Sequence, residues 1–240
     1  DYYESLMKRY KCTHYVAVAT SAVREAKNKT AFLDKTHLNI EVIDGSKEAS
    51  LSQKGILFTL DYLKKERWVG FDLGGGSCEF IFCDKTRIVK SFSVKLGVVK
   101  LLEQFCPNDP PTEENLQMVG LQFKKELLKN SLDFEYDYLI GNAGTVTSLC
   151  AMDLNLTKYD YNKCENYRLS KHNVKRLLEE MVSMDRVSRL KRHPVLEEGR
   201  EDVIVVGAKV VLTIMETFHK DCVYTTNGSL LEGLIVEHFC

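Results

Sequence analysis

The sequence predicts an α/β protein in which mixed sheets are flanked by helices. Short apolar runs rich in β-branched residues recur along the chain, and segments with apolar residues at helical spacing separate them. The run 68–73 leads through the glycines at 74–76 into a second alternating segment, which indicates two strands joined by a tight loop. A further apolar run, 136–140, also ends in a glycine loop, 141–145, before a helical pattern. With 240 residues, two compact lobes fit the length as well as one large domain.

The first part of the chain is expected to form a helix, two strands and a long helix. Residues 1–11 are polar with apolar residues on one helical face, and 15–20 alternate in the manner of a buried strand. A second strand is expected over 38–43. The turn 44–46 then leads into a helix over 47–65. Its apolar stripe consists of Leu51, Ile56, Leu60 and Leu63.

The middle of the chain continues this alternation of strands and helices. Residues 87–96 are expected to form a strand and 97–105 a short helix opened by a glycine. Thr112 and Ser170 are expected to cap the helices that follow them. Residues 153–168 are polar with several tyrosines, which favours a surface excursion.

Residues 200–218 favour a strand by propensity but a helix by periodicity. Val203–Val206 are β-branched, yet the apolar residues recur at helical spacing, at 203, 204, 207, 208, 211, 212 and 215. We therefore predict a buried helix, followed by a last strand over 222–225 and a last helix over 228–239.

Composition excludes several classes of protein. The 33 basic and 34 acidic residues give a net charge of -1, so no general field attracts nucleic acid or an anionic membrane. The 8 cysteines are scattered, without a C-x-x-C pair or zinc-ligand spacing, and are expected to be reduced thiols of a cytoplasmic protein. No apolar run approaches the ~20 residues of a membrane-spanning helix.

The stretch from Asp72 to Ser77 carries the clearest chemical signal. Glycines at 74–76 permit positive-φ conformations in which successive N–H groups converge on one anion. Asp72, at the end of the strand, then lies where a Mg²⁺ ion bridging a phosphate needs an oxygen ligand. The alternative is a flexible linker, since G-G-G-S is a linker sequence. The two strand-like runs that flank it favour the phosphate loop.

Two other positions have both a functional and an ordinary interpretation. Thr20 and Ser21 end a strand and precede Arg24, which suits an anion pocket, but Thr-Ser is also a common helix N-cap. Glu48 lies in the first turn of a helix, where a carboxylate simply favours the helix dipole.

Six segments together, in this order, resemble the exopolyphosphatase and guanosine pentaphosphate phosphohydrolase family, and they span essentially the whole chain. They are A-T-S-A-V-R-E-A-K-N at 19–28, I-D-G-S-K-E-A at 43–49, D-L-G-G-G-S-C-E at 72–79, G-N-A-G-T at 141–145, R-E-D-V-I at 200–204 and L-L-E-G-L at 230–234. The resemblance implies the fold of the actin, hexokinase and sugar-kinase superfamily, with two ribonuclease-H-like lobes closing over a phosphate cleft. We expect a first lobe over 1–66, a second over 67–227, and a C-terminal helix, 228–240, that returns to the first lobe.

The same resemblance implies site residues and a cofactor. Glu48 would be the catalytic base, Asp72 and Glu79 the acids associated with Mg²⁺, and Arg24 a phosphate contact. The implied phosphate-binding backbone consists of Gly74, Gly75, Gly76, Ser77, Gly144 and Thr145.

The sequence departs from the family pattern at five positions, Asp44, Lys47, Cys78, Ser229 and Leu231. These bear on substrate preference and metal geometry. The family's first β-hairpin, with its own Asp-x-Gly-Ser loop, has no counterpart here, so the first lobe is expected to be incomplete.

The activity implied is Mg²⁺-dependent hydrolysis that releases the terminal phosphate of polyphosphate or guanosine pentaphosphate, since both present a terminal phosphoanhydride. A non-catalytic alarmone sensor and a kinase or ATPase on the same fold are the alternatives. No nucleic acid or membrane partner is expected, and a homodimer is one assembly that the sequence allows. A polyanion also needs a cationic track, although lysines in a 28% charged protein are commonly only solvated surface residues. Its candidates are Lys27, Lys95, Lys100 and Lys209.

Overall fold

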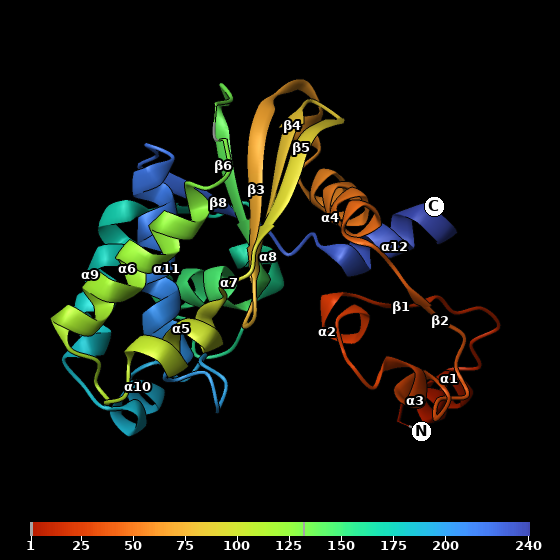
Figure 1. The fold of residues 1–240 in the computed structure, drawn as a ribbon, viewed down its shortest axis with the longest axis horizontal. Helices are drawn as coiled ribbons and strands as arrows, with labels where there is room; N and C mark the ends of the chain where they lie inside the picture. The colour runs from red at the N-terminus through yellow and green to blue at the C-terminus, as the bar shows by residue number, and fades with distance from the viewer. Residues whose placement is uncertain (1, 132) are drawn as a thin grey trace.

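The computed structural model describes residues 2–131 and 133–240 and contains one six-stranded and one two-stranded sheet (Figure 1). The large sheet has the order β5-β4-β3-β6-β8-β7. Pairing is antiparallel between β5, β4 and β3, parallel from β3 through β6 to β8, and antiparallel between β8 and β7. The carboxyl ends of β3 and β6 therefore lie at one edge. The strands are β3 Arg67–Leu73, β4 Cys78–Asp84, β5 Arg87–Val94, β6 Tyr138–Asn142, β7 Arg168–Ser170 and β8 Cys222–Thr225.

One face of this sheet is covered by a layer of helices that forms the main core (Figure 1). The alternation of β3 directs Val69, Phe71 and Leu73 into this layer. The predicted buried helix is confirmed as α11, which lies at the centre of the layer and is apolar on nearly all sides. The helices are α5 Val98–Phe105, α6 Glu113–Leu127, α7 Ala143–Asp153, α9 Lys171–Val182 and α11 Val203–Thr217.

The opposite face of the sheet is covered by α4, Gly45–Thr59, and the short 3-10 helix η1, Asp61–Lys65. Apolar side chains of both helices pack on Trp68 and Ile140. The helix expected over 47–65 is therefore two helices, because Leu60 leaves helical geometry at φ -119° and ψ 68°.

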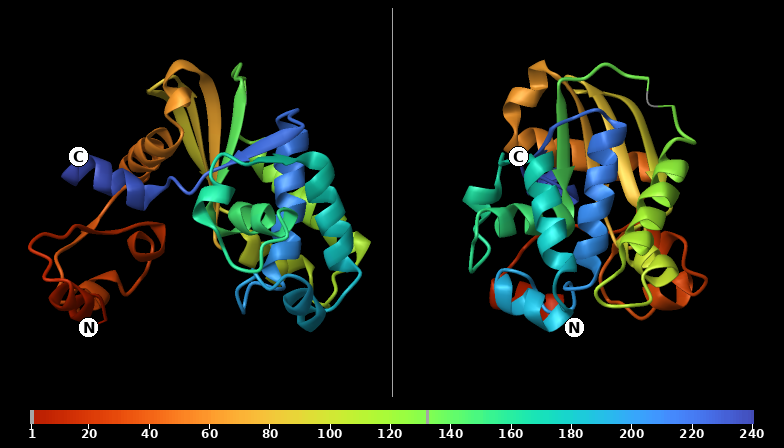
Figure 2. Two further views of the ribbon diagram at one scale, coloured as in Figure 1. Left: turned by 180° about the vertical axis from the view of Figure 1, so that it is seen from behind. Right: turned by 90° about the vertical axis from the view of Figure 1, so that its left-hand side faces the viewer.

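The N-terminal part is small and contains the two-stranded parallel sheet, in which Ala17 pairs with Ile40 and Ala19 with Val42. The C-terminal helix α12, Leu230–Phe239, returns to α4, and both views in Figure 2 show the two side by side. Their contact is close, since a Cβ on Gly233 would lie 1.9 Å from the carbonyl oxygen of Leu51. The remaining N-terminal elements are α1 Tyr2–Arg9, β1 Ala17–Ala19, α2 Ser21–Arg24, α3 Lys29–Leu33 and β2 Ile40–Val42.

Residues 153–168 are not only a surface excursion. They include the short helix α8, Tyr161–Cys164, whose Cys164 is buried against Cys150 and Ala151. Strand β7 and the helix α10, Arg186–Arg192, were also missed by the sequence pattern. Each is short and gains its order from tertiary contacts, which local periodicity does not report.

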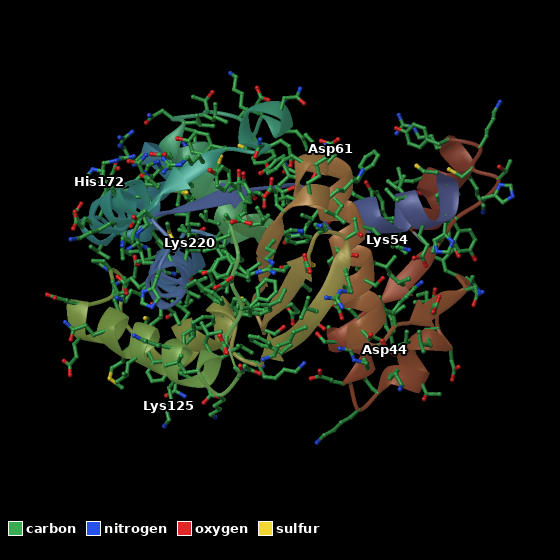
Figure 3. All side chains as sticks on the ribbon, turned by 90° about the horizontal axis from the view of Figure 1, so that it is seen from above. Asp44, Lys54, Asp61, Lys125, His172 and Lys220 are labelled. Atoms are coloured by element: carbon green, nitrogen blue, oxygen red, sulfur yellow. The ribbon has the colours of Figure 1, made fainter. Side chains whose placement is uncertain are left out.

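Side chains at the two ends of the molecule belong to different layers. Asp44 and Lys54 project on the side formed by α4 and α12, whereas Lys125 of α6 and His172 of α9 lie at the opposite end, on the helical layer (Figure 3). All eight cysteines are free thiols. Within the described ranges, no helix has the length and hydropathy needed to cross a bilayer.

Candidate active site

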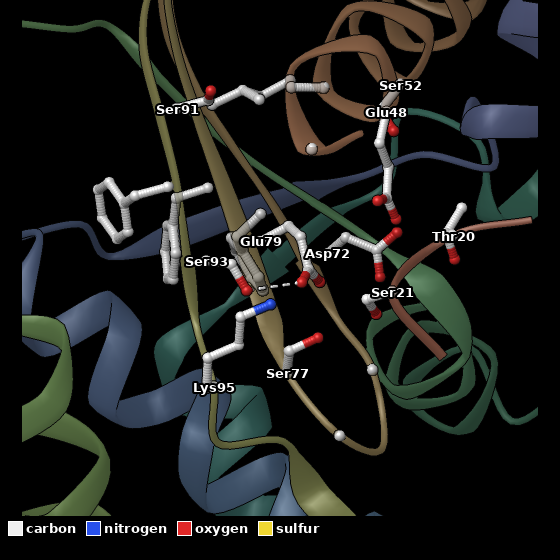
Figure 4. Close-up of a pocket in the computed structure, with 18 of the residues that line it drawn as sticks. Thr20, Ser21, Glu48, Ser52, Asp72, Ser77, Glu79, Ser91, Ser93 and Lys95 are labelled. Carbon is white, nitrogen blue, oxygen red and sulfur yellow. Dashed lines mark hydrogen bonds between the residues drawn. The ribbon is translucent and has the colours of Figure 1, made fainter. Parts of the chain in front are cut away.

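A cavity of about 760 Å³ lies between the N-terminal part, the start of α4 and the β3–β4–β5 side of the large sheet. It brings together most of the residues predicted from the sequence. Figure 4 shows the carboxylates of Glu48, Asp72 and Glu79 directed into the same space. The predicted residues that line it are Arg24, Glu48, Asp72, Gly74, Gly75, Gly76, Ser77, Glu79, Lys95 and Lys100.

Asp72 and Glu79 are cross-strand partners on β3 and β4. Directly opposed side chains on antiparallel strands lie on the same face, so two like charges are held close together. Burial, and next the charges of Glu79 and Glu48, raise the pKa of Asp72 to about 7. No residue in the described part of the chain donates a hydrogen bond to the Asp72 carboxylate. Asp72 is therefore a candidate ligand for a cation.

Glu48 enters the cavity from the first turn of α4. The helix begins there because the Asp44 side chain accepts a hydrogen bond from the Lys47 N–H at 2.8 Å. Arg24 Nη1 donates to the Ile43 carbonyl at 2.7 Å and lies 3.4 Å from Glu48 Oε2. Burial raises the pKa of Glu48, and the Arg24 hydrogen bond opposes that rise only in part. A carboxylate with a raised pKa is a stronger base.

The loop Gly74–Ser77 lines the cavity, but its glycines do not have the predicted positive φ. The N–H groups of Gly75, Gly76 and Ser77 donate to no described residue. None of the three loop glycines has a positive φ, so that part of the sequence argument is wrong. The close contact at this loop is made by Gly97, on which a Cβ would lie 2.4 Å from the Gly74 carbonyl oxygen, whereas a Cβ on any of the three loop glycines would meet no described atom beyond its chain neighbours closer than 3.1 Å.

The second glycine segment differs more from its prediction. Gly141 is inside β6, and α7 begins directly at Ala143, a non-glycine residue with φ 71°. Gly144 is covered by Arg200, whose Nη1 would lie 1.8 Å from an added Cβ. Thr145 is buried against Gly207. Neither Gly144 nor Thr145 lines the main cavity, and their phosphate role stays a prediction.

The four candidate lysines separate into two groups. Lys95 and Lys100 line the cavity, and Lys95 Nζ lies 3.0 Å from Glu25 Oε1 on its opposite wall. Lys27 does not line it. Lys209 faces a second hollow of about 880 Å³ between α6, α9 and α11, so the structure does not bring it to the predicted track.

Several further residues line the cavity, among them Thr20 and Ser21, for which the sequence left an anion pocket and an ordinary helix N-cap both open. Ser91, Ser93 and Asn142 also line it and were not predicted as site residues. Ser93 Oγ donates to Glu79 Oε1 at 2.8 Å, which the register of β4 and β5 makes possible (Figure 4). The alternation of Ser91 and Ser93 along β5 was a signal, but only the strand register shows what they face.

The acids suit a divalent cation of the Mg²⁺ type. Within the described residues, no group of three or more His, Cys, Asp or Glu side chains is arranged so that it could hold a metal ion by itself. Mg²⁺ rarely needs one, because it is bound by one or two carboxylates together with waters and substrate phosphates. Asp72 and Glu79 provide such a pair of neighbouring oxygen ligands, and the absence of a hydrogen-bond donor to Asp72 fits this use.

Comparison with known protein families matches residues 1–239 to the Ppx/GppA phosphatase family. The chain belongs to this family. The resemblance inferred from the six segments is therefore confirmed.

Relatives within the Ppx/GppA family carry different names. Exopolyphosphatase 2 of Mycobacterium tuberculosis is 30% identical over 98% of this chain and 78% of its own length. The bifunctional 3-dehydroquinate synthase/phosphatase of Fusobacterium nucleatum is 30% identical over 98% of this chain, which spans 36% of that protein. The guanosine-5'-triphosphate,3'-diphosphate pyrophosphatase of Vibrio parahaemolyticus is 27% identical, and 44% of it is covered.

Solved structures of the family share the fold. The Ppx/GppA member from Aquifex aeolicus superposes with a TM-score of 0.87 at 31% identity, over 98% of this chain and 77% of that one. An exopolyphosphatase from Cytophaga hutchinsonii superposes with a TM-score of 0.86 at 27% identity, over 98% of this chain and 78% of that one. The predicted fold class is confirmed, with a mixed sheet flanked by helices as in these neighbours.

Proposed function

We propose that this cavity hydrolyses the terminal phosphoanhydride bond of inorganic polyphosphate or of guanosine pentaphosphate. The observation that carries the proposal is that three carboxylates line the same cavity as a loop in which three backbone N–H groups donate to no described residue. The relatives named exopolyphosphatase and guanosine-5'-triphosphate,3'-diphosphate pyrophosphatase support this substrate class.

The chemistry follows from the position of each group. Glu48 orients a water molecule and accepts its proton as the oxygen attacks the terminal phosphorus, while the bond to the bridging oxygen breaks and the shortened chain leaves. The amides of Gly75, Gly76 and Ser77 hold the oxygens of the transferred phosphoryl group. Mg²⁺, when held by Asp72 and Glu79, would neutralise charge on the phosphate oxygens.

The family departures leave this cavity intact. Asp44 caps α4 in place of the usual serine, Cys78 is buried outside the cavity lining, and Lys47 pairs with Glu237 on α12. The alternative of a non-catalytic alarmone sensor rested on such departures. It is therefore kept as an outcome of the test and not as a second proposal.

The test is phosphate release from tripolyphosphate, long-chain polyphosphate and guanosine pentaphosphate, each with Mg²⁺ and with EDTA. We expect release from at least one substrate with Mg²⁺ and none with EDTA. Tight binding of guanosine pentaphosphate without release would establish the sensor instead. Absence of both binding and release would overturn the proposal.

A further inference from the structure

Asn142 is a buried polar side chain at the carboxyl end of β6, and it lines the cavity. It is only 2% exposed. In the parallel register it stands opposite Asp72 of β3, so the two side chains lie on the same face of the sheet. Its Nδ2 donates to the Gly228 carbonyl at 3.0 Å. Its Oδ1 accepts no hydrogen bond from any residue that the structure describes.

The orientation of the Asn142 amide is fixed by chemistry. The Gly228 carbonyl can only accept a hydrogen bond, so the amide nitrogen has to face it and Oδ1 has to face away. Gly228 is itself held in place, because its N–H donates to Thr226 Oγ1 at 2.9 Å and a Cβ on it would lie 2.4 Å from the Gly55 carbonyl oxygen. Asn142 Oδ1 is therefore a rigidly placed acceptor.

A buried acceptor without a donor destabilises the folded state, so Asn142 Oδ1 calls for a hydrogen-bond partner. Capping of α7 does not supply one, since the Asn142 side chain makes no cap hydrogen bond. With a cation bound, the neighbouring carboxylates of Asp72 and Glu79 are ionised and can only accept hydrogen bonds. A water molecule bound to a divalent cation is a strong donor, and Mg²⁺ usually keeps several waters.

We propose that Asn142 Oδ1 accepts a hydrogen bond from a water of the hydrated divalent cation bound at Asp72 and Glu79. Asn142 is then a positioning residue for that cation. The inference rests on the cation role in the proposed function. It adds a side-chain amide from the second glycine segment, whose Gly144 and Thr145 do not line the cavity.

The test measures Mn²⁺ binding, with Mn²⁺ alone as the probe, by the electron paramagnetic resonance of the free ion. Wild type is compared with Asn142→Leu and Asn142→Asp in the full chain. Loss of a residue that hydrogen-bonds to the ligands of a metal typically lowers metal affinity by about 10-fold to 100-fold. We expect a loss of Mn²⁺ affinity of this size for Asn142→Leu. Asn142→Asp keeps an acceptor and adds charge, so it should bind Mn²⁺ at least as tightly as wild type.

If Asn142 has a purely structural role, Asn142→Asp is expected to be the more damaging of the two variants, and the damage appears in thermal stability. Asp in this position places a carboxylate against the Gly228 carbonyl, so Asn142→Asp should lose more thermal stability than Asn142→Leu. Mn²⁺ affinity that falls equally in both variants, or in neither, would overturn the proposal. Should Asn142→Asp fail to fold, the affinity of folded Asn142→Leu decides alone.

Asn173→Leu is the matched control. Its Nδ2 donates to Asp153 Oδ2 at 2.8 Å, and the residue lies outside the cavity lining, so Mn²⁺ affinity should not change. Phosphate release by wild type is assayed separately. A protein that binds Mn²⁺ with the predicted ranking but releases no phosphate would refute the proposed function and leave the role of Asn142 standing.

Discussion

At the scale of single residues, the carboxylates that line the cavity repel one another. Asp72 and Glu79 are opposed on neighbouring strands, Glu48 adds a third carboxylate, and Arg24 contacts only Glu48 among them. A folded protein accepts such repulsion where a ligand relieves it. Asp72 is the residue at which this cost is measurable.

Asp72→Asn should change how stability depends on pH. The pKa of Asp72 is raised from 3.8 to about 7, so between these values the folded state holds a proton that the unfolded state has lost. Its contribution to stability is therefore lost as pH rises from about 4 to about 7, when no cation is bound. In EDTA, Asp72→Asn should flatten this decline and stabilise the protein at about pH 8 by at most about 4 kcal/mol.

Urea unfolding at about pH 5 and about pH 8 measures this effect. Wild type should lose more stability between the two than Asp72→Asn does. Parallel pH profiles for the two proteins would show that Asp72 ionises normally.

At the scale of elements, α4 is the helix on which the site depends, since its first turn carries Glu48 and its side packs on both the sheet and α12. The crossing with α12 is made close by glycines. A Cβ on Gly55 would lie 2.0 Å from the Ser229 carbonyl oxygen, and one on Gly233 would meet the Leu51 carbonyl. Lys47 and Lys54 also pair with Glu237 across this contact.

Gly233→Ala should separate the two helices. The added methyl would lie 1.9 Å from backbone, which cannot move as a side chain does, so we expect a loss of roughly 1–3 kcal/mol in urea unfolding. Gly45→Ala is the control, because nothing lies within 4 Å of its Cβ and alanine favours helix. Equal stability of the two variants would contradict the close crossing.

The elements also show what sequence could and could not predict. The strands on either side of Gly74–Ser77 and the helix α11 followed from local periodicity, which reports burial on one side or all around. The φ angles of the loop glycines were predicted wrongly, because glycine permits positive φ without requiring it and the sequence alone does not fix the value. Asn142 and Ser93 were missed since their place beside Asp72 and Glu79 depends on strand register.

At the scale of the whole molecule, the candidate lysines are divided between two hollows. Glu48, Asp72 and Glu79 line the cavity beside α4 together with Lys95 and Lys100, whereas Lys209 lines the hollow between α6, α9 and α11. A polyanion that enters the cavity meets Lys95 already paired with Glu25. Its gain from that lysine is therefore limited.

Lys95→Ala should raise KM for long-chain polyphosphate by about threefold and leave kcat unchanged, because an exposed charge contact contributes about 0.5–1 kcal/mol. Added salt should reduce the difference in KM between Lys95→Ala and wild type, because salt screens the charge contact. Lys209→Ala, the control from the other hollow, should leave KM unchanged. A larger effect at Lys209 than at Lys95 would place the polyanion elsewhere.

The central claim is that Glu48, from α4, acts on a phosphoryl group held beside Asp72, from the sheet. The most direct measurement is single-turnover phosphate release by Glu48→Gln, together with its affinity for polyphosphate. Glutamine keeps the shape of Glu48 but cannot take up the proton, so release should slow by about 10²-fold to 10⁴-fold with little change in affinity. Release at the wild-type rate would contradict the claim.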